Sequence, residues 1–196
     1  DMPGEECGLV GVFNHPEAAK LAYLALYALQ HRGQENAGIC VSDGRHLRLH
    51  KGSGLVADVF SEAVLDELSG PSAIGHVRYS TTGMSRPENA QPLLAKYHGG
   101  SMAVAHNGNL TNAEELREQC ERNGAIFQTS TDSEILLHLI AHASTEDFAE
   151  ALLLSLLRLK GAYSVVVLTP ERLVALRDPR GFRPLCLGRL PNDGWV

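Results

Sequence analysis

The order of the apolar segments is the feature that most restricts the fold of this 196-residue chain. Apolar runs at residues 9–13, 37–42 and 47–50 predict strands, and Asp43-Gly44 between the last two is typical of a two-residue hairpin turn. Later helical segments follow one another without a strand between them. A doubly wound parallel sheet needs alternating strands and helices, so the sequence favours an α+β fold in which largely antiparallel sheets lie between helices.

The remaining elements are predicted from apolar periodicity and from capping residues. Asn112 with Glu115, and Thr131 with Glu134, resemble capping boxes at helix starts. The helix beginning at Pro16 is apolar nearly all round, which predicts that it is buried between other elements. Helices are expected at residues 16–30, 61–68, 112–124, 135–143 and 145–159, and further strands at 73–77, 102–106, 163–168, 173–176 and 185–187.

Composition excludes several classes of protein. The net charge of −6 and the pI near 5.8 argue against a nucleic-acid partner, because phosphate binding needs clustered Lys and Arg. No apolar run approaches the ~18 residues of a membrane span, which argues against a membrane partner. Residues 1–6 are polar and acidic, unlike a secretory signal. We therefore expect one globular domain in the reducing cytoplasm.

The four cysteines lack a C-x-x-C pair, which argues against a cysteine-based zinc site or redox pair. Cys40, Cys120 and Cys186 lie among apolar neighbours, so we expect them to be buried and inert. Cys7 differs, because it stands between a short polar segment and the first predicted strand. It is the cysteine whose position most invites a chemical role.

Two short motifs carry weak signals. Residues 52–57 fit the loose G-x-G-x-x-G/A pattern of a dinucleotide site, but no long helix follows and Ile74 stands about where an acidic residue is needed. A loop that requires small residues is the favoured interpretation. His138 and His142 are four apart on a predicted helix, but the Glu of a metalloprotease motif is missing between them. Structural histidines are favoured, and no metal site is predicted.

Four polar stretches remain, each at the end of an apolar element, where loops commonly build sites. They are residues 30–35, 75–83, 106–110 and 129–134. Each has an ordinary interpretation when taken singly. Arg78 fits a surface ion pair, Asn107-Gly108 fits a plain turn, and Asp132 fits a charge that complements a helix N-terminus.

Taken together with Cys7, these stretches resemble the glutaminase domain of the class II glutamine amidotransferases, and within that family the amidophosphoribosyltransferases. Residues 160–163 and 177–185 extend the resemblance over nearly the whole chain. It implies the N-terminal-nucleophile hydrolase fold, with four αββα layers and two largely antiparallel sheets inside. It also implies that residues 1–6 are a leader and that residues 7–196 are the glutaminase domain of a longer chain with a C-terminal phosphoribosyltransferase domain.

The resemblance assigns the catalytic roles. Cys7 becomes the first residue when the leader is removed, and its thiolate attacks the side-chain amide of glutamine. The freed α-amino group, with a pKa near 8, serves as the base. Asn107 and Gly108 match the oxyanion hole. The alternative is a Cys7–His106 dyad, which ranks lower because His106 ends an apolar strand.

The resemblance also assigns substrate binding. Arg78 matches the cation that holds the glutamine α-carboxylate, and Asp132 matches the anion that holds the α-ammonium. Tyr79 and Thr81 are expected to complete that pocket. Arg32 is expected to orient the surroundings of the nucleophile.

The longer enzyme would pass ammonia to phosphoribosyl pyrophosphate, forming 5-phosphoribosylamine in de novo purine synthesis. Magnesium and a 4Fe–4S cluster are implied only for the full-length enzyme, as is a homo-oligomer, a tetramer in the family. No cofactor is expected in this segment. Two alternatives stay open: the glutaminase domain of a different class II enzyme, such as a glucosamine-6-phosphate or asparagine synthetase, and an unprocessed, catalytically silent precursor or binding module.

Overall fold

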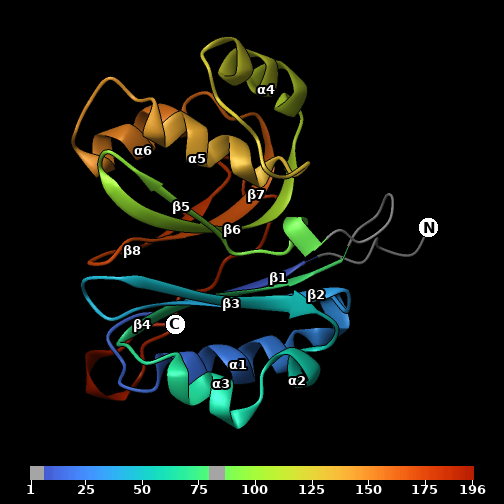
Figure 1. Ribbon diagram of the computed structural model, residues 1–196, viewed down its shortest axis with the longest axis vertical. Helices are drawn as coiled ribbons and strands as arrows, with labels where there is room; N and C mark the ends of the chain where they lie inside the picture. The colour runs from blue at the N-terminus through green and yellow to red at the C-terminus, as the bar shows by residue number, and fades with distance from the viewer. Residues whose placement is uncertain (1–6, 80–86) are drawn as a thin grey trace.

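A computed structural model describes residues 7–79 and 87–196, so Thr81 and residues 1–6 lie outside the described part. Two antiparallel four-stranded sheets lie face to face (Figure 1). The first has the order β1-β4-β2-β3 and the second the order β5-β6-β7-β8. Their bounds are β1 Gly8–Val12, β2 Asn36–Ser42, β3 Leu47–Ser53, β4 Ser72–Arg78, β5 Leu93–Tyr97, β6 Gly100–Leu110, β7 Gly161–Leu168 and β8 Leu173–Arg177.

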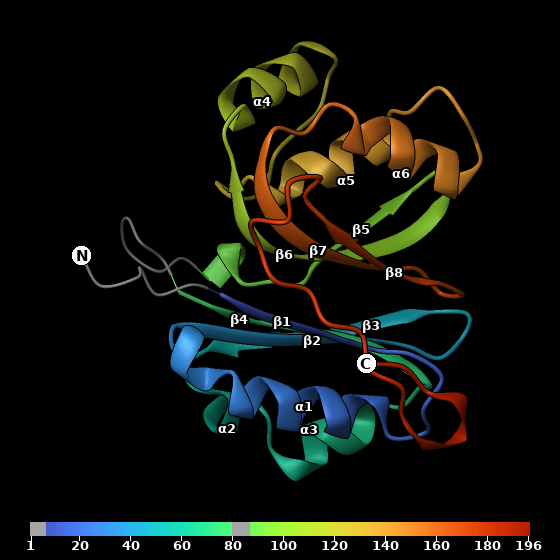
Figure 2. The same ribbon diagram turned by 180° about the vertical axis from the view of Figure 1, so that it is seen from behind.

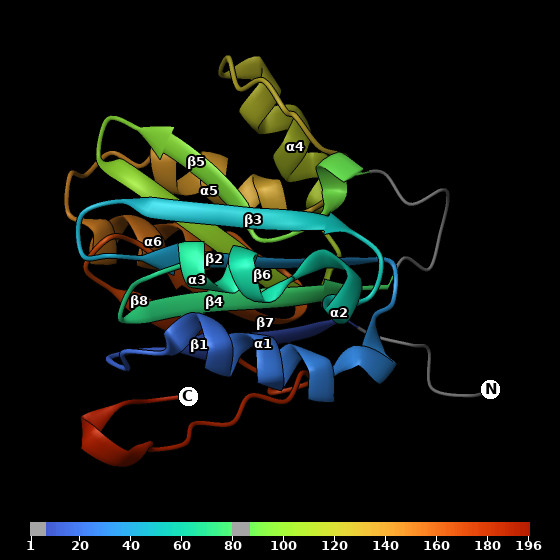
Figure 3. The ribbon, with the colours of Figure 1, turned by 60° about the horizontal axis from the view of Figure 1, so that its bottom comes forward.

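Helices cover the two outer faces of this pair of sheets. The first sheet is covered by α1, α2 and α3, and the second by α5 and α6, with α4 beyond them (Figure 2). Figure 3 shows α1 and α3 lying over the outer face of the first sheet. The four-layer αββα arrangement predicted from the sequence is therefore confirmed. The bounds are α1 Ala18–Ala28, α2 Val56–Val59, α3 Glu62–Glu67, α4 Ala113–Arg122, α5 Ser133–Ala141 and α6 Phe148–Leu156, with short 3₁₀ turns at Gln30–Arg32, Pro87–Asn89 and Pro191–Asp193.

Strand alternation decides which side chains enter which layer. On β6, Met102 and Val104 pack toward the helices, whereas Ala103 and Ala105 pack toward the other sheet. On β1, Val10 and Val12 belong to the core under α1, and Leu9 faces the second sheet. Odd-numbered residues at the start of β1 and on β6 therefore face the space between the sheets.

Several sequence predictions need correction. Helix α1 is not buried all round, because it forms the outermost layer and exposes Leu24 and Tyr27 (59% each). The loop after β2 has four residues rather than two, and Asp43 closes it by accepting the backbone N–H groups of Arg45 and His46. Residues 185–187 form no strand, since this segment runs past the edge of the sheets without a ladder partner.

Strand β5 was not predicted, because its short LLAKY run shows no clear alternation. The two expected capping boxes do not form either. Asn112 precedes α4, but its side chain bonds the Arg158 carbonyl and the Lys160 N–H instead. Asp132, rather than Thr131, is the residue at the start of α5. The local sequence therefore placed both helix starts to within one residue, but it did not predict the hydrogen-bond partners.

Candidate active site

Cys7 stands immediately before β1, and strand alternation turns its side chain toward the space between the sheets. Its half-buried Sγ lies 3.7 Å from the backbone carbonyl oxygen of Tyr79, which follows β4. Burial raises the pKa of the Cys7 thiol, while the positive charge of Arg78 opposes that rise and the negative charge of Asp132 adds to it. Two opposite charges therefore act on the thiol.

Arg32 anchors the backbone at the nucleophile position. Its Nε donates a hydrogen bond of 3.2 Å to the Cys7 carbonyl oxygen. The 3₁₀ turn Gln30–Arg32 that follows α1 brings the guanidinium to this place. The structure thus brings Arg32 to Cys7, in the arrangement that a positioning role requires.

Asn107 shares a cavity of about 350 Å³ with Cys7 and Arg32. It is buried on β6, and it faces the space between the sheets like Ala103 and Ala105. The next residue, Gly108, has a φ of +153°, and a Cβ atom there would lie 2.1 Å from the Ala162 carbonyl oxygen on β7. Only glycine fits at this position without separating β6 from β7.

His106 points to the opposite side of β6, because it neighbours Asn107 in the strand. Its Nδ1 lies 3.1 Å from Ser133 Oγ and 3.3 Å from Asp132 Oδ1, both at the start of α5. The imidazole is therefore committed to the helical side of the sheet. This geometry leaves the alternative Cys7–His106 dyad without support.

Asp132 is held by two groups of β6. Its Oδ2 accepts the Leu110 N–H at 3.0 Å, and its Oδ1 faces His106. Burial raises the pKa of this carboxyl, but the contact with His106 and the Leu110 N–H outweigh burial and bring the pKa below its ordinary value. Asp132 is thus a stable anion near the nucleophile.

Arg78 ends β4 with a largely buried side chain, and its Nη1 lies 4.0 Å from Glu35 Oε2. The register Gly8↔Val77 between β1 and β4 places the end of β4 beside Cys7. Tyr79 contributes its carbonyl to the thiol, and Thr81 lies outside the described residues. Cys7, Arg32 and Asn107 thus line one cavity, the Tyr79 carbonyl contacts the thiol, and the charges of Arg78 and Asp132 act on it.

The sequence did not single out several supporting residues. Glu35 faces Arg78, and Gln91 accepts the His106 N–H at 2.7 Å. His76 is fully buried between the sheets, and its Nε2 lies 3.0 Å from the His106 carbonyl oxygen. Glu35 and His76 lie in two of the polar stretches, residues 30–35 and 75–83. The sequence of a stretch does not show which of its side chains point into the site.

The cysteine predictions hold in part. Cys40 and Cys120 are buried, but Cys186 is exposed and lines the same cavity as Cys7. The segment that carries Cys186 forms no strand, so it is not covered by a neighbouring element. An apolar neighbourhood in sequence did not imply burial there.

The weak motifs have structural explanations. Gly54 adopts a φ of +120° at the turn into α2, which agrees with a loop that needs small residues. His138 lies 3.6 Å from Glu134, and His142 bonds the His138 carbonyl oxygen, as expected for structural histidines. Over residues 7–79 and 87–196 no three His, Cys, Asp or Glu side chains are placed to hold a metal ion.

Within the described ranges, no helix is both long and apolar enough to cross a membrane.

The sequence is 54% identical to amidophosphoribosyltransferase 1, chloroplastic, of Arabidopsis thaliana, over all of this chain and 35% of that protein. It is 47% identical to the amidophosphoribosyltransferase of Bacillus subtilis, over 98% of this chain and 40% of that protein. The chain thus spans well under half the length of these relatives.

The solved structures give a similar result. The glutamine phosphoribosylpyrophosphate amidotransferase of B. subtilis, in complex with ADP and GMP, superposes with a TM-score of 0.89 at 45% identity. The match covers 95% of this chain and 40% of that one. The family model described as the glutamine amidotransferase domain matches residues 76–196. With a matching fold, a matching sequence and this arrangement around Cys7, the chain belongs to the glutamine amidotransferase domain family.

Proposed function

We propose that this chain is the glutaminase half of an amidophosphoribosyltransferase, which hydrolyses glutamine through Cys7 and supplies the ammonia. The observation that carries the proposal is the Cys7 thiol, which lies in one cavity with Asn107 and Arg32 and on which the charges of Arg78 and Asp132 act. A glutamine side-chain amide at the thiol would have its α-carboxylate and α-ammonium within reach of complementary charges.

The chemistry begins with the removal of residues 1–6, which turns the Cys7 nitrogen from an amide into an amine. That amine takes the thiol proton, and Sγ attacks the amide carbon of glutamine. The Asn107 side-chain amide and the Gly108 N–H stabilise the negative oxygen of the tetrahedral intermediate. The carbon–nitrogen bond then breaks, the amine returns its proton to the leaving group, and ammonia departs. Water hydrolyses the remaining thioester to glutamate and frees the thiol.

Arg78 binds the substrate carboxylate, because its planar guanidinium can hold both oxygens. Asp132 binds the ammonium, since two of its acceptor directions are taken by Leu110 and His106 and others remain. Tyr79 completes the pocket beside the thiol, and Thr81, which lies outside the described residues, is proposed as a further member of it. Arg32 holds the Cys7 carbonyl in place while the new N-terminus acts.

The experiment that tests the mechanism is labelling of the full-length protein with a diazo-ketone analogue of glutamine, followed by mass spectrometry. We expect the active protein to begin at Cys7 and to take up one equivalent of label on Cys7. Cys7→Ala should abolish both labelling and glutamine hydrolysis. Cys186→Ala is the matched control, since Cys186 lines the same cavity and should not affect either. Stoichiometric label on any other cysteine, or hydrolysis by Cys7→Ala, would refute the mechanism.

The partner reaction lies in the part of the relatives that this chain does not span. The name of the B. subtilis relative, a glutamine phosphoribosylpyrophosphate amidotransferase, supports phosphoribosyl pyrophosphate as the acceptor of the ammonia, and we propose a C-terminal domain as the place of that transfer. Magnesium, a 4Fe–4S cluster and a homo-tetramer remain proposals for that longer protein. The cytoplasm is the proposed compartment, with a plastid as the alternative that the plant relatives' names raise.

A further inference from the structure

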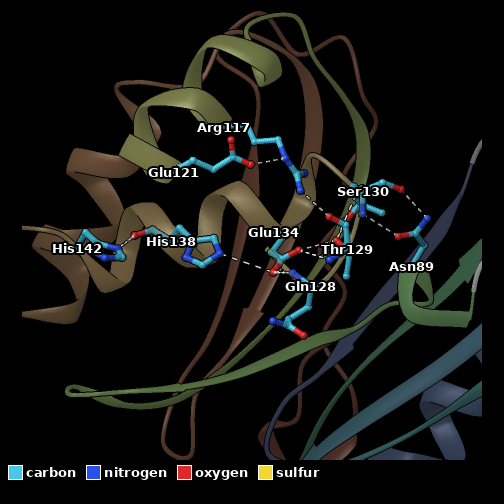
Figure 4. A network of polar contacts seen from close by, with 10 residues as sticks. Asn89, Arg117, Glu121, Gln128, Thr129, Ser130, Glu134, His138 and His142 are labelled. Carbon is cyan, nitrogen blue, oxygen red and sulfur yellow. Dashed lines mark hydrogen bonds and ion pairs between the residues drawn. The ribbon is translucent and has the colours of Figure 1, made fainter. Parts of the chain in front are cut away.

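Glu134 stands in the first turn of α5 with a buried side chain, and it bonds the segment before the helix. Its Oε1 accepts the Gln128 N–H at 2.8 Å. Its Oε2 accepts both the N–H and the hydroxyl of Thr129, each at 2.7 Å. Figure 4 shows this carboxylate at the centre of a polar cluster. One buried acidic side chain therefore satisfies three donors of a single loop.

Two further elements hold the same loop. Arg117 on α4 donates to the Thr129 carbonyl oxygen at 3.0 Å. The buried Asn89 donates to Ser130 Oγ at 2.9 Å and accepts the Ser130 N–H at 3.1 Å (Figure 4). Residues 128–130 are thus fixed from α5, from α4 and from the turn at Pro87–Asn89.

Asp132 is separated from these fixed residues by Thr131 alone; its carbonyl oxygen accepts the Ile135 N–H of α5 at 3.1 Å, but its side chain makes no capping hydrogen bond to that helix. Its carboxylate meets β6 only through Leu110 and His106. The path of the backbone into Asp132 is therefore set by the contacts of Glu134 on one side and by α5 on the other. A shift of the loop would move the Asp132 carboxylate relative to Arg78 and Cys7.

We propose that Glu134 is a positioning residue for the binding of the substrate α-ammonium group, acting through the loop 128–131 on Asp132. The proposal rests on the proposed function, in which Asp132 holds that ammonium. It assigns to Glu134 a part in substrate selection, distinct from the general stability of α5.

The informative change is Glu134→Gln. An amide keeps the shape of the carboxylate, but one of its two ends becomes a donor that faces the N–H groups of Gln128 or Thr129. At least one hydrogen bond to a charged acceptor is lost, and a donor is left facing a donor. The loop must move to relieve this, and Asp132 moves with it.

The experiment compares glutamine with 4-carbamoylbutanoate, which is glutamine without its α-amino group, in the full-length protein. Glu134→Gln should lower kcat/KM for glutamine about tenfold, mainly by raising KM, because a hydrogen bond to a charged group is worth roughly that factor. It should leave kcat/KM for 4-carbamoylbutanoate within about twofold, since that substrate has no ammonium to misplace. Asp132→Asn removes the negative charge that is proposed to bind the ammonium. Its loss of selectivity for glutamine is therefore the largest effect that Glu134→Gln can have.

Glu118→Gln is the matched control. It makes the same substitution on α4 in an exposed side chain that pairs with Arg122, and it should leave both substrates unaffected. If Glu134→Gln does not fold, Thr129→Val removes one donor to Glu134 while keeping the side-chain shape, and about a threefold loss of selectivity is expected.

An equal fall in kcat/KM for both substrates would overturn the inference, because a merely structural role affects them alike. An unchanged selectivity would overturn it as well, and so would a parent protein without preference for glutamine. The proposed function fails by a different result, namely the absence of Cys7 labelling and of glutamine hydrolysis. The two failures are therefore distinguishable.

Discussion

His76 connects the two sheets beneath the candidate site, and it does so as a neutral side chain. It is fully buried on β4, and its Nε2 bonds the carbonyl oxygen of His106, the residue before Asn107. Burial lowers the pKa of His76 to about 3 from its ordinary 6.5. Acidification from pH 7 to pH 5 should therefore destabilise the folded chain through this residue.

The sign follows from proton binding. Between pH 6.5 and about pH 3 the unfolded chain binds a proton at His76 and the folded chain does not. Stability due to His76 is thus complete above pH 6.5 and declines as the pH falls, by up to about 1.4 kcal/mol per pH unit. At pH 5 the loss amounts to about 2 kcal/mol. Asp132, whose pKa is lowered, contributes stability that is complete above its ordinary pKa of 3.8 and is lost only below it, outside this pH range.

The measurement is urea unfolding of the 196-residue chain between pH 5 and pH 7.5, followed by the fluorescence of its single tryptophan, Trp195. His76→Gln keeps a donor for the His106 carbonyl but removes the titration. The difference in pH dependence between parent and variant isolates His76, since burial also lowers the pKa of His138 and both proteins retain it. Equal pH dependence in the two proteins would refute a neutral, fully buried His76.

Three further predictions concern the site. Gly108→Ala should reduce kcat about 100-fold or more, because its Cβ would meet the Ala162 carbonyl and displace an oxyanion donor; normal kcat would contradict this. Arg78→Lys should raise KM for glutamine about tenfold with little change in kcat, since lysine cannot hold a carboxylate in a fork, and steady-state kinetics test it. Iodoacetamide at pH 8 should modify the exposed Cys186 long before Cys40, whose pKa burial raises to about 12, and peptide mapping measures the order.

The fold class was predictable because it depends on local signals that add up. Hairpins early in the chain and consecutive helices later exclude a doubly wound sheet, and the observed layers agree. The wrong predictions concern the exposure of side chains, which a short stretch of sequence does not encode. The exposure of Leu24 on α1 and of Cys186 depends on which elements lie outside them, and nothing within a short window reports that.

The polar stretches of the site were also predictable, but the contacts within them were not. Thr131 and Glu134 have the spacing of a capping box, yet Glu134 bonds Gln128 and Thr129 instead. The loop path, held by Asn89 and Arg117 from distant elements, decides which donors reach the carboxylate. The spacing between Thr131 and Glu134 in the sequence carries no information about those distant partners.

The sequence alone determined the residue types available for chemistry and the position of Cys7 before the first strand. Tertiary structure decided which of these groups meet. Register between β1 and β4 brings Arg78 to Cys7, and strand alternation sends Asn107 into the space between the sheets and His106 to its other side. The physical reason is that charge, hydrogen bonding and burial act over a few ångströms in space, and only the packing of the layers fixes which residues lie within that range.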